Sequence, residues 1–232
     1  LVGSEMCIRD RKKTQYTTFE DAGCFTGFSV REEGNNVVVT ANYKLGCFDQ
    51  AVWTISPDGT AAIDFTYNFS GVVDLMGVMF DYPEDKVLSK RWVGDGPYRV
   101  WQNRLHGPQL GVWENEYNDP IPAESFTYPE FKGYFANVQW MTLETQEGMI
   151  SICNRTPQNY VGVYQPRDGR DGLLYTFPVT GISLMKVIPP VRNKVNTTDL
   201  IGPSSQAFWA DGEYGGGITL SLIHISEPTR RR

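Results

Sequence analysis

Within residues 60–70, the side chains from Ile63 to Ser70 alternate between apolar and polar, and this two-residue period constrains the fold more than any other feature of the sequence. Successive side chains of a β-strand point to opposite faces of its sheet, so the period predicts a strand with one buried face. Pro57-Asp58-Gly59 comes directly before this segment and has the residue types of a tight turn, which predicts a hairpin with residues 51–56. The apolar positions of the alternation are Ile63, Phe65, Tyr67 and Phe69, and the polar positions between them are Asp64, Thr66 and Asn68.

Segments rich in β-branched and aromatic residues recur along the rest of the chain, as in all-β proteins. We expect a second hairpin in which residues 137–143 and 149–153 flank a turn at residues 145–148. No window combines helix caps with the three- and four-residue apolar spacing of an amphipathic helix, so helices should be scarce. The predicted fold is all-β, a large antiparallel β-sandwich. Further strands are expected at residues 36–44, 74–81, 109–116, 160–165, 173–178 and 182–187.

The two ends of the chain differ in origin from the middle. Residues 1–10 (LVGSEMCIRD) and 220–230 (LSLIHISEPTR) can be encoded by one DNA segment that is read on opposite strands, as a translated sequencing adapter would be. Such segments are excluded from fold reasoning in the same way as fusion scars. We therefore predict non-native, adapter-derived segments at residues 1–11 and 220–232, and one β-sandwich domain at residues 12–219 that is a fragment of a longer protein.

The composition argues against several partners. The chain has 27 acidic and 21 basic residues, a net charge of −6. Once the predicted adapter-derived ends are excluded, the remaining acidic segment has no Lys/Arg cluster that would bind a phosphate backbone, so nucleic acid is not an expected partner. No apolar run approaches the roughly 18 to 20 residues that cross a bilayer, so no membrane partner is expected.

Histidine and cysteine are sparse. His106, expected in a loop, is the only histidine of residues 12–219, and no CxxC or His-x-x-x-His spacing occurs, so no metal site is predicted. The cysteines of the same segment are expected either as single buried thiols or as one disulfide with a free cysteine. They are Cys24, Cys47 and Cys153.

Residues 90–140 carry a glycine- and proline-broken aromatic run with interspersed arginine, asparagine and glutamate, a mixture suited to carbohydrate. Its most specific pattern is Trp92-x-Gly94-x-Gly96-Pro97, followed by Trp101 and by Asn103-Arg104. This pattern resembles the C-terminal domain of glycoside hydrolase family 2 β-galactosidases, where the family has W-x-G-x-G-P-x-E-x-Y-x-D-R. The chain departs from it at Arg99, Trp101 and Asn103, where the family commonly has Glu, Tyr and Asp. A second part of the resemblance comprises Tyr128, Pro129, Glu130, Gly133 and Trp140.

The resemblance implies a supersandwich similar to galactose mutarotase, in a parent enzyme that hydrolyses terminal β-galactosides with retention. Such enzymes use two carboxylic residues about 5 Å apart, which the family places in a preceding TIM barrel, so this segment alone should be inert. Its implied partners are that TIM barrel and, through the parent enzyme, a β-galactoside, and the resemblance leaves room for a homo-oligomer. It implies no cofactor in this segment and allows a divalent cation in the parent enzyme.

Four residues are candidates for contact with the sugar, and each has a structural alternative. Trp209, with Phe208 beside it, could form a sugar-facing platform or pack in the core. Arg104 beside Trp101 could bind sugar hydroxyls, or could be a paired or stacked arginine.

Other motifs of the sequence favour structural roles. We expect a tight turn at Gly94, Gly96 and Pro97 that places Trp92 and Tyr98 on opposite sides of the backbone. Residues 215–217, three glycines, favour a flexible turn over a phosphate-binding loop, since no strand-to-helix transition surrounds them. Glu114 and Glu116, about 7 Å apart on one strand face, favour a solvated face over a hydrolytic pair.

Two further functions remain open at the level of the sequence. The aromatic and amide-rich middle also suits a stand-alone carbohydrate-binding module. A sugar epimerase or lyase on the same sandwich would need a positioned base and acid, usually histidines, and the single histidine of residues 12–219 argues against it.

Overall fold

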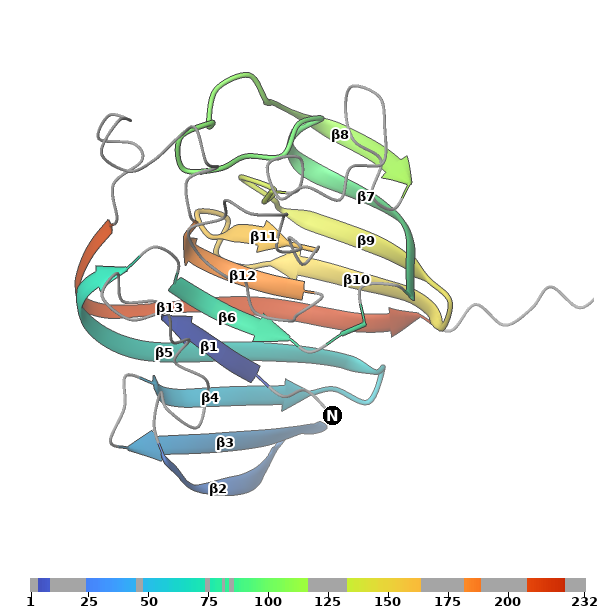
Figure 1. Cartoon of the computed structure of the whole chain (residues 1–232). Coiled ribbons are helices and arrows are strands. Elements are labelled where there is room, and N and C mark those ends of the chain that lie inside the picture. Colours follow the sequence, from blue (N-terminus) through green and yellow to red (C-terminus); the bar gives the residue numbers. More distant parts are fainter. Residues whose placement is uncertain are drawn as a thin grey trace, which may run out of the picture.

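The computed structural model describes residues 4–8, 24–44, 48–73, 76–80, 82–83, 86–116, 133–163, 182–188 and 208–223. Every helix or strand within these ranges is a β-strand (Figure 1). The prediction of an all-β fold with antiparallel pairing is therefore confirmed. The strands are β1 (Ser4–Ile8), β2 (Cys24–Glu33), β3 (Asn36–Lys44), β4 (Phe48–Ile55), β5 (Thr60–Val73), β6 (Met76–Phe80), β7 (Val87–Gly96), β8 (Gln109–Glu116), β9 (Trp140–Thr145), β10 (Gly148–Asn154), β11 (Tyr160–Gly162), β12 (Ile182–Val187) and β13 (Phe208–Ile223).

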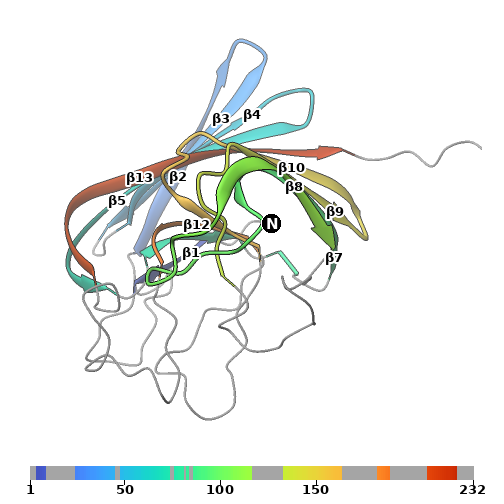
Figure 2. The same ribbon diagram turned by 90° about the horizontal axis from the view of Figure 1, so that it is seen from above.

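These strands form two antiparallel sheets of unequal size. The larger has nine strands in the order β2-β3-β4-β5-β13-β10-β9-β7-β8, and the smaller has four in the order β1-β6-β12-β11. Strand β13 lies in the middle of the larger sheet and pairs with β5 on one side and β10 on the other. Seen from above, the β3–β4 region projects away from the smaller sheet (Figure 2).

The core lies between the two sheets. The larger sheet contributes Ile63, Phe65 and Trp92, the smaller sheet contributes Val78 and Leu184, and all five belong to one buried cluster. The larger sheet buries one face against the smaller sheet, so the alternation of apolar and polar residues along its strands favours the sandwich. Strands β6 and β12 of the smaller sheet are buried on both faces.

The hairpin predicted from residues 51–70 is confirmed. Ile63, Phe65 and Tyr67 of β5 are at most 3% exposed, as the two-residue period predicts. The turn is closed by a hydrogen bond from the Thr60 backbone N–H to a carboxylate oxygen of Asp58 at 2.9 Å. Gly59 has a φ of 85°, a conformation that glycine adopts without a steric penalty.

Most of the other expected strands are also present. β3 and β12 have the predicted bounds to within a residue, β9 and β10 form the second hairpin, and the first residues of the strand expected at 160–165 form β11. The strand expected at residues 173–178 lies outside the described residues. The expectation did not include β1, β2, β7 or β13.

The three glycines at residues 215–217 correct a prediction. They lie inside β13 and not in a flexible turn. A side chain at Gly215 would place its Cβ 2.7 Å from the Phe65 carbonyl oxygen, and one at Gly216 would lie 2.8 Å from the Phe65 ring. The glycines are therefore explained by the close packing of β5 against β13 and not by a need for flexibility.

Two strands reach into the segments predicted to be adapter-derived. β1 lies within residues 1–11 and pairs with β6, and β13 continues past residue 219 to Ile223 alongside β10. The division of the chain at residues 11 and 219 stays a prediction. Over the described ranges, none of the chain forms a helix long and apolar enough to cross a membrane.

Candidate functional site

Gly94 and Gly96 lie within β7, so the expected tight turn is wrong for these two positions. The chain leaves the strand only after them, at the cis peptide bond between Gly96 and Pro97. Trp92 is fully buried and Tyr98 is 48% exposed. The ring of Trp92 therefore lies in the core and that of Tyr98 at the surface, and their placement on opposite sides of the backbone stays a prediction.

The two glycines of β7 are explained by lack of space. A Cβ at Gly94 would lie 2.9 Å from the Cα of Val138, and one at Gly96 would lie 2.5 Å from the ring of Trp113. The Trp113 indole N–H donates to the Gly94 carbonyl oxygen at 3.2 Å. Any side chain at either position would have to displace backbone or a packed indole.

Trp92 is a core residue. Its indole N–H donates to the Asp95 carbonyl oxygen at 3.0 Å, and its ring meets the Phe135 ring edge-on, with centroids 4.7 Å apart. Asp95 in turn accepts a hydrogen bond from the Asn137 side-chain amide at 2.6 Å. The motif therefore binds β7 to the segment at residues 135–138.

Trp101 and Arg104 are brought together, but they face different environments. Their backbones exchange two hydrogen bonds, of 2.8 and 3.3 Å, that close one turn. Trp101 is 2% exposed and packs edge-on against Tyr134, and a Cβ at Gly133 would lie 2.9 Å from its indole nitrogen. Arg104 is exposed. A buried ring cannot stack on a sugar, so Trp101 is corrected from a sugar-contact candidate to a core residue.

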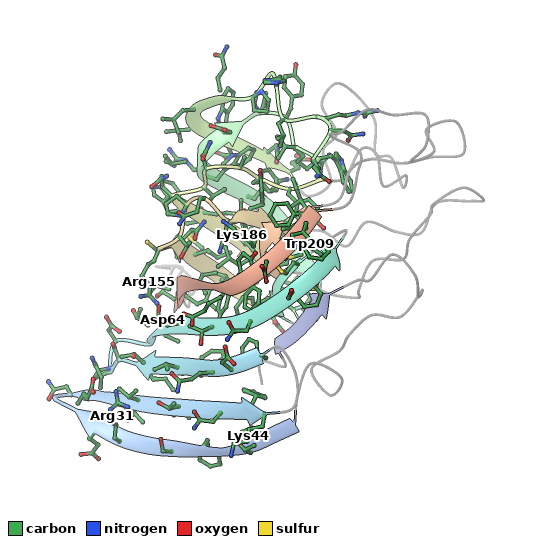
Figure 3. All side chains as sticks on the ribbon, turned by 90° about the vertical axis from the view of Figure 1, so that its left-hand side faces the viewer. Arg31, Lys44, Asp64, Arg155, Lys186 and Trp209 are labelled. Carbon is green, nitrogen blue, oxygen red and sulfur yellow. The ribbon has the colours of Figure 1, made fainter. Side chains whose placement is uncertain are left out.

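Phe208 and Trp209 open β13 opposite Val73 and Val72 of β5. Trp209 is 64% exposed and Phe208 is 39% exposed, and Figure 3 shows Trp209 at one end of the strand. Of the four sugar-contact candidates, Trp209 therefore has the largest accessible aromatic face. It lies on a different element from the turn that holds Arg104.

The two carboxylates that the sequence offers as a pair, Glu114 and Glu116, are not enclosed in the structure. Glu114 and Glu116 are exposed and alternate with less exposed residues along the edge strand β8, as expected for a solvated face. The pKa of the Glu147 carboxyl lies below its usual range, mainly because it accepts a hydrogen bond from the Lys86 ammonium. Retaining hydrolysis needs an acid whose pKa is raised.

A shallow hollow of about 410 Å³ lies on the outer face of the larger sheet. Trp140 of β9, 37% exposed, borders it, together with Cys153 of β10, whose thiol is free and exposed. The expectation of a buried thiol is therefore wrong for Cys153. The remaining polar lining consists of Thr60, Thr142, Ser151, Thr219 and Ser221.

Part of the sequence motif cannot be placed. Tyr128, Pro129 and Glu130 lie outside the described residues. In the ranges that are described, no three His, Cys, Asp or Glu side chains gather in a way that could hold a metal ion.

Sequence reasoning missed one buried charge. Lys90 of β7 is 1% exposed, its ammonium donates to the Glu116 carbonyl oxygen at 2.8 Å, and it lies 6.0 Å from the centre of the Phe135 ring. The signal was present in the sequence, because Lys90, Trp92 and Gly94 share one face of a strand with a two-residue period.

Comparison with known proteins gave one sequence family and several solved structures. None of the curated proteins matches the chain. An aldose epimerase homologue from C. elegans is 10% identical with a TM-score of 0.38, over 86% of this chain and 69% of that chain. The α-N-acetylgalactosaminidase of Bifidobacterium bifidum is also 10% identical, with a TM-score of 0.42, over 94% of this chain and 30% of that chain. This chain thus spans less than a third of the second protein. The beta galactosidase small chain family matches residues 8–183, most of the 232 residues, and the chain therefore belongs to this family.

Proposed function

We propose that this chain is a non-catalytic accessory domain of a β-galactosidase-like glycoside hydrolase. The observation that carries the proposal is the family match over residues 8–183. In the parent enzyme, two carboxylic residues about 5 Å apart, one nucleophile and one acid/base, hydrolyse the β-galactoside with retention. These residues belong to a TIM barrel outside this chain, and the sandwich braces that barrel.

Two features of the described residues support an accessory role. The W-x-G-x-G-P segment is packed into the core, where Trp92 is fully buried, so it stabilises the domain and has no free ring for substrate. The exposed carboxylates of Glu114 and Glu116 stand on a solvated strand. Neither feature supplies the enclosed, tuned pair of carboxyls that glycoside hydrolysis requires.

Trp209 is the residue that we propose for contact with the sugar. Its ring is 64% exposed, and an exposed indole offers a flat apolar face that can pack against the C–H groups of a galactose ring. The sandwich would then supply one aromatic wall of a pocket whose reacting groups come from the barrel. Arg104, exposed on its turn, is the second candidate for contact with the sugar.

Expression of the parent reading frame beside this chain tests the proposal. The parent protein should hydrolyse nitrophenyl β-galactoside and release the β-anomer first, as proton NMR of the product would show. The 232-residue chain alone should release no nitrophenol at the same concentration. An inactive parent protein, or an active isolated chain, would overturn the proposal.

The exposure of Trp209 also favours a second candidate, a stand-alone carbohydrate-binding module. Calorimetric titration of the isolated chain with galactose and lactose separates the two functions. A module should bind with a Kd of about 1 mM or tighter, which is about −4 kcal/mol. An accessory domain that supplies only one wall of the pocket should give no measurable heat.

A further inference from the structure

Five large apolar side chains lie exposed on one face of β2, β3 and β4, and we call this the β2–β4 apolar face. Their exposed fractions range from 39% to 66%. The strand registers place them on the same side, because Phe28 pairs with Ala41 and Val37 pairs with Ile55. The five residues are Phe25, Phe28, Val30, Val37 and Ile55.

The β2–β4 apolar face continues the face of the larger sheet that forms the core. One cross-strand row runs from Phe65 of β5 through Ala51 of β4 and Ala41 of β3 to Phe28 of β2. Phe65 and Ala51 are 3% and 4% exposed, whereas Phe28 is 66% exposed. Among the described strands, the covering layer therefore ends along this row, while the apolar surface of the larger sheet continues to β2.

Aromatic contacts join the covered and the uncovered parts. Phe48, which is 1% exposed, meets Tyr43 edge-on at 4.9 Å, and Tyr43 meets Phe25 at 5.7 Å. Phe25 then stacks on Phe28 at 6.4 Å. A line of four packed rings thus leads from the core to the outermost strand.

The other face of β2 has a different chemistry. Ser29 and Arg31 point away from the apolar side, and Arg31 forms an exposed ion pair with Glu33 at 2.8 Å. The two-sided pattern of β2 is that of a strand with one face against a core.

The four-stranded sheet covers the core face of the larger sheet. Its orientation shows which of its edges lies toward the uncovered β2–β4 apolar face. At one edge of that sheet, Val161 of β11 forms a bridge with Phe135, and Phe135 packs on Trp92 of β7. The opposite edge, β1, therefore points toward β5 and β4. Within the described ranges, the larger sheet has nine strands and the covering sheet has four.

We propose that native β-strands of the parent polypeptide take the place of β1, which lies in the predicted adapter-derived segment, continue the four-stranded sheet beyond β6 and pack on the β2–β4 apolar face. Two sheets pack face to face at about 10 Å through apolar side chains from each, which fits a pleated surface of Phe, Val and Ile. A sugar or a charged domain surface would need several polar groups on this face. The register places one exposed charged residue of β2 there, Glu32 opposite Val37, and the five exposed large side chains are apolar. The inference rests on the proposed function in one respect, that the chain works within a longer polypeptide.

Two adjacent residues of β2 provide a matched test. Val30→Cys places a thiol on the β2–β4 apolar face, and Ser29→Cys places one on the polar face of the same strand. Each is introduced into the 232-residue chain and into the parent protein after the existing cysteines have been replaced by serine, and labelling with a maleimide dye is followed by mass spectrometry. Circular dichroism confirms that each variant keeps its strand content. Hydrogen exchange of the β2 amides in the unsubstituted proteins gives an independent measurement.

In the isolated chain both thiols should react at similar rates. In the parent protein Val30→Cys should react at least about tenfold more slowly, because labelling then requires local opening, while Ser29→Cys should keep its rate. The protection of Val30→Cys should persist when the hydrolytic domain is deleted from the parent protein.

Four results would overturn the proposal. Rapid labelling of Val30→Cys in the parent protein would show an open face, and equal protection of both thiols would show that a whole domain covers β2. Loss of protection on deletion of the hydrolytic domain would assign the face to that domain. In the isolated chain, protection of Val30→Cys could rise with protein concentration while light scattering gives a dimer mass. That result would assign the face to a second copy of the chain. Labelling does not depend on hydrolysis, so an inactive parent protein would refute the proposed function without deciding this test.

Discussion

Gly94 of β7 and Gly111 of β8 lie directly opposite each other in the antiparallel register. The Trp113 indole lies over this pair, since its N–H donates to the Gly94 carbonyl oxygen at 3.2 Å and its ring would be 3.1 Å from a Cβ at Gly111. The two glycines differ in what surrounds them. A Cβ at Gly94 would meet the backbone of residues 136–138, whereas one at Gly111 would meet only the indole.

Gly94→Ala should therefore destabilise the domain more than Gly111→Ala does. Backbone at 2.9 Å cannot yield locally, and overpacking of this kind costs about 1–3 kcal/mol. The indole beside Gly111 can shift by a few tenths of an ångström. Urea unfolding followed by tryptophan fluorescence measures both losses, and equal losses would contradict the explanation.

Replacement of the buried Lys90 should lower the free energy of unfolding more than replacement of Lys86, a more exposed lysine that directly precedes β7. Lys90→Met keeps most of the side-chain volume but leaves the Glu116 carbonyl oxygen without this donor, which costs about 1–3 kcal/mol. The matched control is Lys86→Met, because Lys86 forms a half-exposed ion pair with Glu147 that contributes about 1 kcal/mol or less. Free energies of unfolding in urea compare the two variants. A larger loss for Lys86→Met would contradict the assignment.

The Asp58 turn should make part of the stability depend on pH. Hydrogen bonds from Thr60 lower the pKa of Asp58 from its ordinary value of 3.8. A carboxyl whose pKa is depressed by folding contributes its stability above the ordinary value and loses it as the pH falls through the folded value. The difference in Tm between the wild type and Asp58→Ala should thus be full at about pH 7 and shrink below about pH 3.8.

Asp58→Asn is the control for that measurement, because an amide oxygen can still accept the hydrogen bond but does not titrate. The Tm difference between Asp58→Asn and Asp58→Ala should stay nearly constant across the same range. A wild-type difference that grew as the solution became more acidic would contradict the sign.

Trp209→Ala should weaken sugar binding in the parent enzyme without unfolding the domain. The ring is 64% exposed, so its loss should leave Tm nearly unchanged, while KM for nitrophenyl β-galactoside should rise about tenfold, equivalent to about 1.4 kcal/mol. Trp140→Ala, which removes a second exposed indole from the outer sheet face, should leave KM unchanged. An unaltered KM in Trp209→Ala would contradict the proposed contact between Trp209 and the sugar.

Much of the fold is predictable from local patterns. β5 is predicted by its alternation, and the turn before it is predicted by Pro57-Asp58-Gly59, because both depend on residues close in sequence. β7 and β13 were missed because their glycines indicate turns when they are taken alone. Those glycines are explained by close approach to Val138, Trp113 and Phe65, which are contacts between distant segments.

The candidate site was less predictable for the same reason. The family resemblance is confirmed by the match over residues 8–183, yet the sequence could not separate the buried Trp101 from the exposed Trp209. Exposure depends on which segments pack over a ring, as Tyr134 does over Trp101. The assignment of Trp209 and Arg104 to the sugar stays a proposal.

The central position of β13 has a consequence for how the chain folds during synthesis. β5 and β10 each need β13 as a hydrogen-bonding neighbour, yet β13 is the last strand of the described chain to leave the ribosome. Until it emerges, the nascent protein carries two separate half-sheets, each with an open edge that can pair with another molecule. Ribosome stalling before residue 208 should therefore yield chains that depend on chaperones for solubility.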